Sequence, residues 1–492
     1  MNKLSRAAIA GAVALSAATA PFAAAQTYNV GEVTALIPAA STSDEADELL
    51  DGKSGDIDFP YVGNIKALAT IGEVDPASGN VLTGYPDGQA AWLANENTVR
   101  IVYQSESYGT MSNQTYPWPM QTGATFTGSH IHAIDYDREG LADFLKNDAS
   151  ASTIFKGSSH LFDRTFNVFG EEVVPRSQGG LWGNQVTPDR QFVDYAPNRQ
   201  LTEADFFFQS FCGAYYEWPN KYGPGIGFAD HIWLHGEEWN IQRMFTTASD
   251  SIVFDTNQTM GLASMVVDIA NKTAYTAPAL GQTGYEKLLP INPQHPDYVV
   301  IVAAGYNHGL EPAPLKIYIG RKGFGADGKP LPANAPERDQ FLARNGLLYG
   351  KLYGVALANE EFARLGISEI STSSMMMDDY MTNPDAPDNF PVAFVSTSYR
   401  WEGWDKGVAV GQTEMARWQM AEEQPAGHTF FVGDSKTEHP AVDPDITKTR
   451  WAQNMTQKGG ILSFDLTNLK AELEAADGDL PMLVTGNAIR TI

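Results

Sequence analysis

The chain contains the segment Tyr298-Val299-Val300-Ile301-Val302-Ala303, a run of β-branched and aromatic side chains of strand length. Similar runs recur along the sequence, and residues that favour turns separate them. The other runs span residues 99–103, 315–319, 392–396 and 461–464, and the turn signals include Pro86-Asp87-Gly88, Asp75-Pro76, Asp327-Gly328 and Asp434-Ser435. This pattern predicts an all-β protein.

Many short strands in one long chain, with no obvious linker, favour small sheets arranged around an axis over a single sandwich. We therefore expect residues 59–492 to form one β-propeller domain with long insertions. Repeats of a fixed period are not visible, so the number of blades does not follow from the residues. The few helical patterns, at residues 356–365, 413–423 and 468–476, predict peripheral helices.

The N-terminus has the order of a secretory signal peptide. Lys3 and Arg6 precede an Ala/Val/Leu core, and Ala25 closes a run of small residues, so we expect residues 1–25 to be removed after Ala25. Residues 26–58 form a polar, acidic lead-in segment. The predicted location is the periplasm or the medium. Cys212 is the only cysteine, so stability must come from the core rather than from a disulfide within the chain.

Charge and hydropathy exclude several classes of function. The 492 residues carry 33 Lys and Arg against 59 Asp and Glu, a net charge of -26, which argues against nucleic-acid binding. Beyond the signal peptide, no apolar run has the roughly 18 to 20 residues of a membrane-spanning helix. An acidic surface favours divalent cations and also suits any salt-tolerant secreted protein. We expect a monomer.

The segment around the single cysteine combines several unusual features. Cys212 and Gly213 lead to a loop with Trp218-Pro219, and the segment from Ile232 to Trp239 predicts a strand that ends in the adjacent carboxylates Glu237 and Glu238. A thiolate and a carboxylate meeting at strand ends are typical transition-metal ligands, and further carboxylates suit harder cations. The alternative interpretation is a small buried cysteine beside a solvated acidic turn.

Three other carboxylates lie on or just after apolar runs. Glu106 follows the run 99–103, Glu286 follows Tyr285, and Glu402 lies in Arg400-Trp401-Glu402-Gly403. If each comes from a different blade and points to a common axis, together they form a site for several cations. Taken singly, each is equally consistent with a wet strand end on the surface.

The order of these motifs resembles that of the PhoX-type alkaline phosphatases, which are secreted six-bladed propellers containing iron and calcium. The resemblance extends from Trp92 to Asp434 and rests on short motifs: a strand ending in Glu, a Cys-Gly loop, Glu-Glu-Trp, aromatic-Glu and Arg-x-Glu-Gly. It implies hydrolysis of phosphate esters, with a small phosphorylated substrate. The implied cation ligands are Glu106, Cys212, Glu238, Glu286 and Glu402, and Arg400 is implied to hold phosphate oxygens and, with Glu402, to act in catalysis.

The chain departs from the family's motifs beside these residues. Gln104-Ser105-Glu106 stands where the family usually has Asn-His-Glu, Cys212-Gly213-Ala214-Tyr215 replaces Cys-x-Gly-Gly, and Trp401 replaces a proline. The family is typically exported folded through the twin-arginine route, and this signal peptide has no Arg pair. The resemblance therefore implies calcium more strongly than iron.

Several weaker candidates stay open. His130 and His132 are alternate residues of a possible strand and share a face, which suits a metal, but the sequence places no third ligand, and a hydrogen-bonded pair is the alternative. Candidate residues in predicted loops are His308, His439, Asp434 and Glu438. Adjacent Met375, Met376 and Met377 cannot all face one ion from a regular strand, so we interpret them as core residues.

Two other classes of function remain as alternatives to a phosphatase. One is a non-catalytic acidic propeller that binds calcium or a surface partner, in which Cys212 is only buried. The other is a different propeller enzyme, such as a lactonase or a quinone-dependent dehydrogenase.

Overall fold

The computed structural model describes most of the chain between Leu68 and Thr491, together with two short strands before it. The described residues are 29–30, 64–65, 68–106, 118–144, 151–167, 170–175, 178, 206–208, 211–236, 264–281, 285–305, 315–367, 380–397, 427–430, 439–454 and 460–491. The predicted signal peptide lies outside them, as does all of the lead-in segment except β1 (Asn29–Val30).

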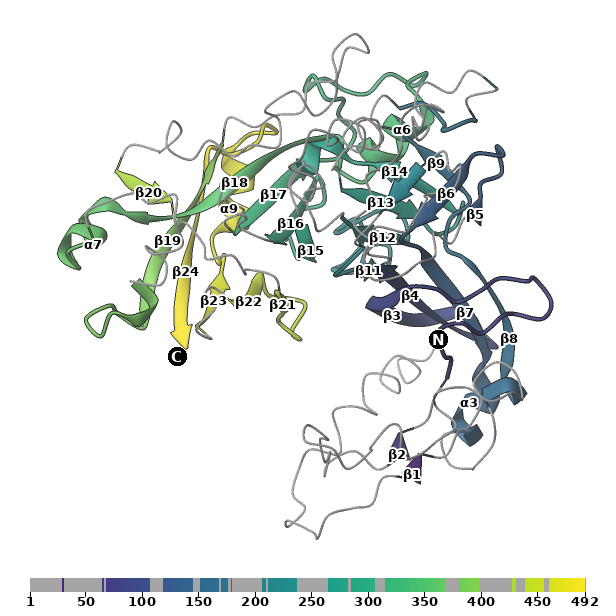
Figure 1. The fold of residues 1–492 in the computed structure, drawn as a ribbon. Helices are drawn as coiled ribbons and strands as arrows, with labels where there is room; N and C mark the ends of the chain where they lie inside the picture. The colour runs from purple at the N-terminus through teal and green to yellow at the C-terminus, as the bar shows by residue number, and fades with distance from the viewer. Residues whose placement is uncertain are drawn as a thin grey trace, which may run out of the picture. The chain divides into compact units, whose positions relative to one another are not determined.

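The described part of the chain is mostly β, as Figure 1 shows. It divides into two compact units. The smaller unit contains residues 1–83, 91–101 and 133–159, and the larger unit contains residues 84–90, 102–132 and 160–492. All the described candidate ligands belong to the larger unit.

The smaller unit contains β1, which pairs in parallel with β2 (Asn64–Ile65), and the short helix α3 (Arg138–Phe144). Its loops are held by buried polar contacts. The Asp75 carboxylate accepts hydrogen bonds from the backbone N–H groups of Ala77 and Ser158, at 2.9 and 2.8 Å. These bonds stabilise the Asp75-Pro76 turn that the sequence predicts.

A four-stranded sheet contains several of the residues of the candidate sites. Its order is β3 (Tyr85–Asn95), β4 (Thr98–Glu106), β7 (Ile131–Asp137) and β8 (Phe155–His160). The parts of these strands that belong to the larger unit are the start of β3, the end of β4, the start of β7 and the last residue of β8. Ser105 N–H donates to the His130 carbonyl at 2.8 Å, which ties the end of β4 to the chain entering β7.

Two smaller sheets of the larger unit follow in the sequence. One has the order β11 (Tyr215–Glu217), β12 (Ile232–His235), β13 (Met265–Asp268), β14 (Thr273–Thr276) and β9 (Arg164–Phe166), and all its pairs are antiparallel except β14 with β9. The other contains β10 (Phe206–Phe208), β6 (Thr125–Gly128) and β5 (Trp118–Pro119).

The largest sheet has ten strands and holds the main hydrophobic core. Its order is β15 (Tyr285–Ile291), β16 (Tyr298–Gly305), β17 (Lys316–Arg321), β18 (Tyr349–Ala358), β19 (Asn389–Ser396), β24 (Leu483–Thr491), β23 (Ile461–Asp465), β22 (Arg450–Asn454) and β21 (Ala441–Val442), with β20 (His428–Phe430) also paired to β18. Thr449 donates its hydroxyl proton to the Asn292 carbonyl at 2.8 Å. This bond links the two ends of the strand order, so the sheet is nearly closed and barrel-like.

The strand predictions are confirmed at β4, β16, β17, β19 and β23, and the predicted helix at 468–476 is α9 (Leu469–Ala475). The helix expected at 356–365 is present as α7 (Asn359–Arg364), but it begins later than expected because β18 continues to Ala358. The turn expected at Pro86-Asp87-Gly88 is wrong, since these residues are part of β3. The helix α6 (Glu337–Arg344) was not expected. Residues 413–423 and Asp434-Ser435 lie outside the described residues.

Within the described part of the chain, no helix has the length and apolar character needed to cross a membrane.

Candidate metal centres

Three of the six site residues that the sequence predicts lie in the described part of the chain. Glu106, Cys212 and Glu286 are all buried in the larger unit. The other three, Arg400, Glu238 and Glu402, lie outside the described residues, as does Trp239.

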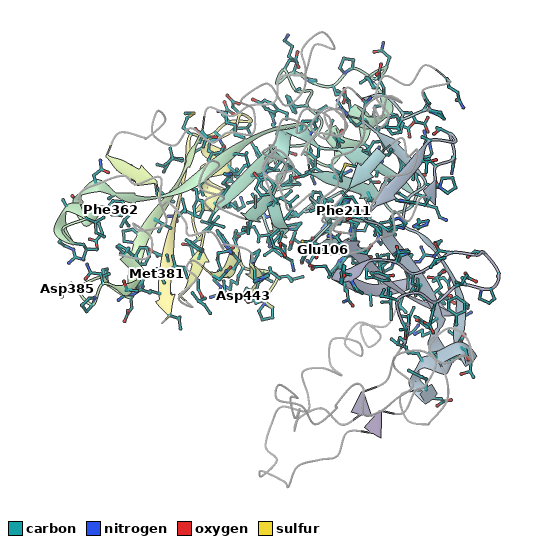
Figure 2. All side chains as sticks on the ribbon, viewed as in Figure 1. Glu106, Phe211, Phe362, Met381, Asp385 and Asp443 are labelled. Carbon is teal, nitrogen blue, oxygen red and sulfur yellow. The ribbon has the colours of Figure 1, made fainter. Side chains whose placement is uncertain are left out.

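Glu106 and Cys212 lie in contact although 106 positions separate them in the sequence. Glu106 is the last residue of β4, and Cys212 lies in the short segment before β11. The Cys212 thiol donates to Oε1 of Glu106, and both side chains are buried. Figure 2 labels Glu106 next to Phe211, the chain neighbour of Cys212. The Cys212 thiol and the Glu106 carboxylate therefore lie in direct contact.

A third acidic ligand comes from β3. Asp87 brings a carboxylate oxygen to within 4.8 Å of the donor atoms of Glu106 and Cys212, so the three form one group of metal-ligating side chains. We call this group the thiol–carboxylate cluster. Asp87 was missed because Pro-Asp-Gly is a strong turn signal, and as a turn residue it would have been solvated.

Burial and neighbouring charge shape the acidity of this cluster. Burial raises the pKa of Asp87, and the nearby Glu106 carboxylate raises it further. The pKa of Asp87 is lowered in turn by the Cys212 side chain, His439 and Lys287. His439, a weak candidate from the sequence, is thus close enough to influence Asp87. Two carboxylates and a thiol, of which only Asp87 is partly exposed, form an arrangement that a cation would stabilise.

Lys287 supplies a positive charge beside the cluster. It lies on β15, directly after Glu286, and burial lowers its pKa while the charges of Glu286 and Asp87 raise it. No local signal in the sequence distinguishes this lysine, since its neighbours in the chain are those of an ordinary strand.

Gln104 positions Cys212 through its amide group. Its Nε2 donates to the Cys212 carbonyl, and its Oε1 accepts the indole N–H of Trp233 at 3.0 Å. The N–H of Gly88 also donates to the Cys212 carbonyl, at 3.2 Å. Gln104 and Trp233 have no exposed surface. Gln104, which differs from the motif of the family that the chain resembles, therefore helps to hold Cys212 in place.

Close backbone packing brings β15 against the cysteine segment. A Cβ atom at Gly213 would lie 2.3 Å from the carbonyl oxygen of Glu286, a distance that only glycine permits. Glu286 is therefore next to Cys212 through its backbone, and its side chain is buried.

A second group of ligands is made of histidines. His130 and His132, the pair that the sequence places on one face, are joined by His160 at the end of β8, and their ligand nitrogens lie within 4.8 Å of one another. We call this group the histidine cluster. The sequence could not find His160, because nothing in the chain indicates that β8 pairs with β7.

The two clusters use opposite faces of β4. Successive side chains of a strand point to opposite sides. Gln104 and Glu106 contact Cys212, whereas the ring of Tyr103 stacks on His132 with centroids 4.9 Å apart. The remaining candidates from the sequence lie outside the described residues: His308, Asp434, Glu438, Met375, Met376 and Met377.

Comparison of the chain with protein-family models, with curated proteins and with solved structures finds no match.

Proposed function

We propose that the protein is a secreted, metal-dependent phosphatase of the PhoX-like type, which hydrolyses phosphate esters at the thiol–carboxylate cluster. The observation that carries the proposal is the contact between Glu106 and Cys212. The order of motifs predicts that these two residues are ligands of shared ions, and surface residues so far apart in the sequence would rarely meet.

The donor set of the cluster supports a transition metal. A thiol with two carboxylates fits iron or a similar ion, because calcium takes oxygen ligands only. Calcium would be held by carboxylate and carbonyl oxygens, for which Glu286 and, from the resemblance, Glu238 and Glu402 are the candidates. Bound cations would neutralise the phosphate and stabilise the negative charge that develops as the ester is cleaved.

The residues of the chain have separate roles in this proposal. Asp87, Glu106 and Cys212 hold the metal, and Gln104 and Gly213 fix the position of the cysteine. Lys287 is a second cation that can orient a phosphate, in addition to the Arg400 that the resemblance implies. Burial of Glu106 and Cys212 keeps water away from these two ligands and strengthens their charge interactions.

The propeller architecture belongs to the same proposal. Its support is three four-stranded runs whose strands pair in the order of the chain: β3-β4-β7-β8, then β11-β12-β13-β14 within the five-stranded sheet, and β15-β16-β17-β18 within the ten-stranded sheet. Such runs are the usual form of a propeller blade. Export to the periplasm or the medium follows from the predicted signal peptide.

The test is hydrolysis of 4-nitrophenyl phosphate by the purified full chain with calcium and iron. We expect activity that chelation abolishes, and a loss of about 100-fold or more in kcat/KM for Glu106→Gln and for Cys212→Ser, because each removes a preorganised charge interaction. Glu361→Gln is the matched control, since Glu361 pairs with Arg364 on the surface of α7.

Two results would contradict the proposal. One is the absence of hydrolysis with either metal. The other is hydrolysis that Cys212→Ser and Glu106→Gln leave unchanged. Calcium binding that raises the melting temperature without any hydrolysis would indicate the non-catalytic alternative.

A further inference from the structure

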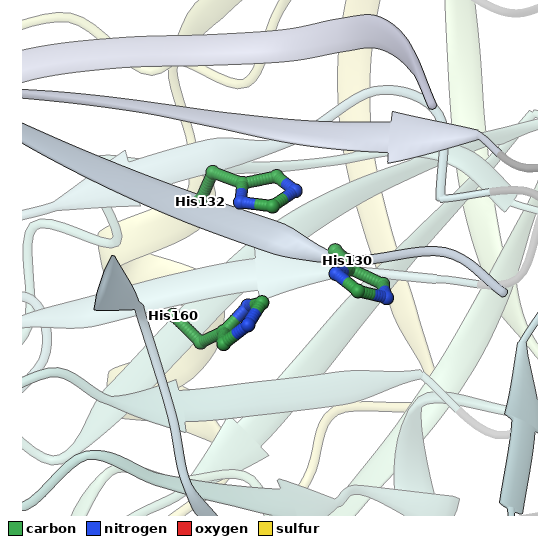
Figure 3. A group of neighbouring side chains, drawn as sticks. All are labelled: His130, His132 and His160. Carbon is green, nitrogen blue, oxygen red and sulfur yellow. The ribbon is translucent and has the colours of Figure 1, made fainter. Parts of the chain in front are cut away.

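The three imidazoles of the histidine cluster form a nearly regular triangle (Figure 3). The ring centroids are 5.2 Å apart for His130 and His132, 5.0 Å for His130 and His160, and 5.2 Å for His132 and His160. Two of the rings come from the start of β7 and the third from the end of the neighbouring β8.

A triangle of this size fits three imidazoles around one tetrahedral ion. With a metal–nitrogen distance of about 2.1 Å, each ring centre lies about 3.2 Å from the ion, and tetrahedral angles then separate the ring centres by about 5.2 Å. The observed separations match this value on all three sides. Packing of unrelated rings imposes no such equality.

Aromatic side chains enclose the cluster. The ring of Trp118 lies 4.0 Å from that of His160 and 5.0 Å from that of His130, and Tyr103 covers His132. Burial lowers the pKa of His132 and His160 well below the usual value, and the neighbouring imidazoles lower it further. Neutral imidazole is the form that binds a metal ion.

One buried ring nitrogen of the cluster makes no hydrogen bond within the described part of the chain. Nδ1 of His160 is buried and has no hydrogen-bond partner among the residues that the structure describes. Such a group in a folded protein calls for an explanation, of which a bound ion is one. His130 and His132 are 2% and 0% exposed, while His160 is partly exposed.

We propose that His130, His132 and His160 bind one divalent transition-metal ion, with zinc as the ion that best suits three imidazoles. Three protein ligands leave the fourth position open to water or a small ligand. Calcium is excluded as the occupant because it takes oxygen donors. The site is separate from the thiol–carboxylate cluster, which faces the other side of β4, and it does not depend on phosphatase activity.

The test is a calorimetric titration of the metal-free full chain with zinc. The Cys212→Ser background is used because zinc also binds thiolates. We expect one zinc ion per chain in this background. Adding His160→Asn should weaken binding by more than the roughly 10- to 100-fold that loss of an outer-shell partner costs. The control His231→Asn, at a histidine that hydrogen-bonds Tyr216 at the surface, should leave the affinity unchanged.

Absence of zinc binding in the Cys212→Ser chain would overturn the proposal, as would an affinity that His160→Asn does not change. A second measurement covers a His160 variant that fails to fold. Cobalt added to the Cys212→Ser chain should give the intense visible bands of a tetrahedral site with nitrogen ligands. The weak spectrum of octahedral cobalt alone would contradict the proposal.

Discussion

The two faces of β4 carry different chemistry. On one face, Glu106 meets the Cys212 thiol beside a second carboxylate, and on the other, Tyr103 packs over neutral histidines. The first cluster gathers negative charge that only a cation can balance, and the second gathers neutral donors in an aromatic shell. The difference shows that the alternation of side chains along a single strand is enough to keep two sets of ligands apart.

The largest effect on stability is expected for Gln104→Leu, which affects only the thiol–carboxylate face. The buried Cys212 carbonyl and the Trp233 indole each lose the hydrogen bond to this amide. The Cys212 carbonyl keeps its bond from the Gly88 N–H. At 1 to 3 kcal/mol for the buried indole N–H and roughly 1 kcal/mol for the bond that the carbonyl loses, the free energy of unfolding should fall by about 3 kcal/mol. Urea unfolding measures this change.

Gln121→Leu is the control, because Gln121 hydrogen-bonds Asp163 at the surface. The zinc affinity of the histidine cluster should survive Gln104→Leu in the chains that remain folded. Equal stability of the two variants would mean that Gln104 does not support the cysteine.

A somewhat smaller effect is expected for Gly213→Ala. The added methyl group would overlap the Glu286 carbonyl, so the cysteine segment must move away from β15. Overpacking of this kind costs about 2 kcal/mol and should also weaken metal binding by the thiol–carboxylate cluster. Gly325→Ala, where a Cβ atom meets nothing closer than 3.3 Å, is the control for a glycine with room. A Gly213→Ala chain with unchanged melting temperature and metal content would contradict this packing.

The sequence predicted the strands better than the partners of those strands. β16 and β4 were found because their β-branched and aromatic runs are continuous. Glu106 and Cys212 were found because each ends or follows such a run within a recognisable order of motifs. The sequence did not reveal Asp87 and His160, because their roles depend on which strands pair, and pairing over long separations leaves no local signal.

Local signals also failed where tertiary structure overrides propensity. The turn signal at Pro86-Asp87-Gly88 is overridden by pairing in β3, where the N–H of Gly88 donates to the Cys212 carbonyl. The helical pattern at 356–365 begins inside β18, whose Ala356 pairs with both β19 and β20. In each case hydrogen bonds to distant strands outweigh the intrinsic preference of a few residues.

A third prediction concerns the pH dependence of stability through His235, which packs edge-on against Phe211. Burial lowers the pKa of His235 to about 3, and its ring nitrogens have no hydrogen-bond partner among the described residues. The unfolded chain, with a pKa of about 6.5, binds the proton first, so this stability is present above pH 6.5 and is lost as the pH falls toward 3.

The loss from this one group at pH 5.5 should be about 1.4 kcal/mol. Urea unfolding at pH 7.5 and at pH 5.5 measures this loss in the natural chain and in His235→Leu. Between the two pH values, the free energy of unfolding of His235→Leu should fall by about 1.4 kcal/mol less than that of the natural chain. Identical losses of unfolding free energy in the two chains would show that His235 is already protonated in the folded protein at pH 5.5, which would contradict its lowered pKa.

The smallest effect is expected for Tyr103→Leu on the histidine face. Leucine keeps most of the apolar burial but loses the stacking on His132, which is worth about 1 kcal/mol. The thermal midpoint should fall slightly, while the phosphatase activity that we propose for the other face should be unchanged. Tyr85→Leu, at an exposed tyrosine of β3, is the matched control. A large loss of activity in Tyr103→Leu would mean that the two faces are coupled.

The thiol–carboxylate cluster is tested by X-ray absorption at the metal edges of protein purified from its natural source. We expect a transition metal with one sulfur neighbour at about 2.3 Å and oxygen neighbours, and loss of the sulfur signal in Cys212→Ser. A transition metal with no sulfur neighbour, or no transition metal at all, would contradict the assignment of Asp87, Glu106 and Cys212 as a metal centre.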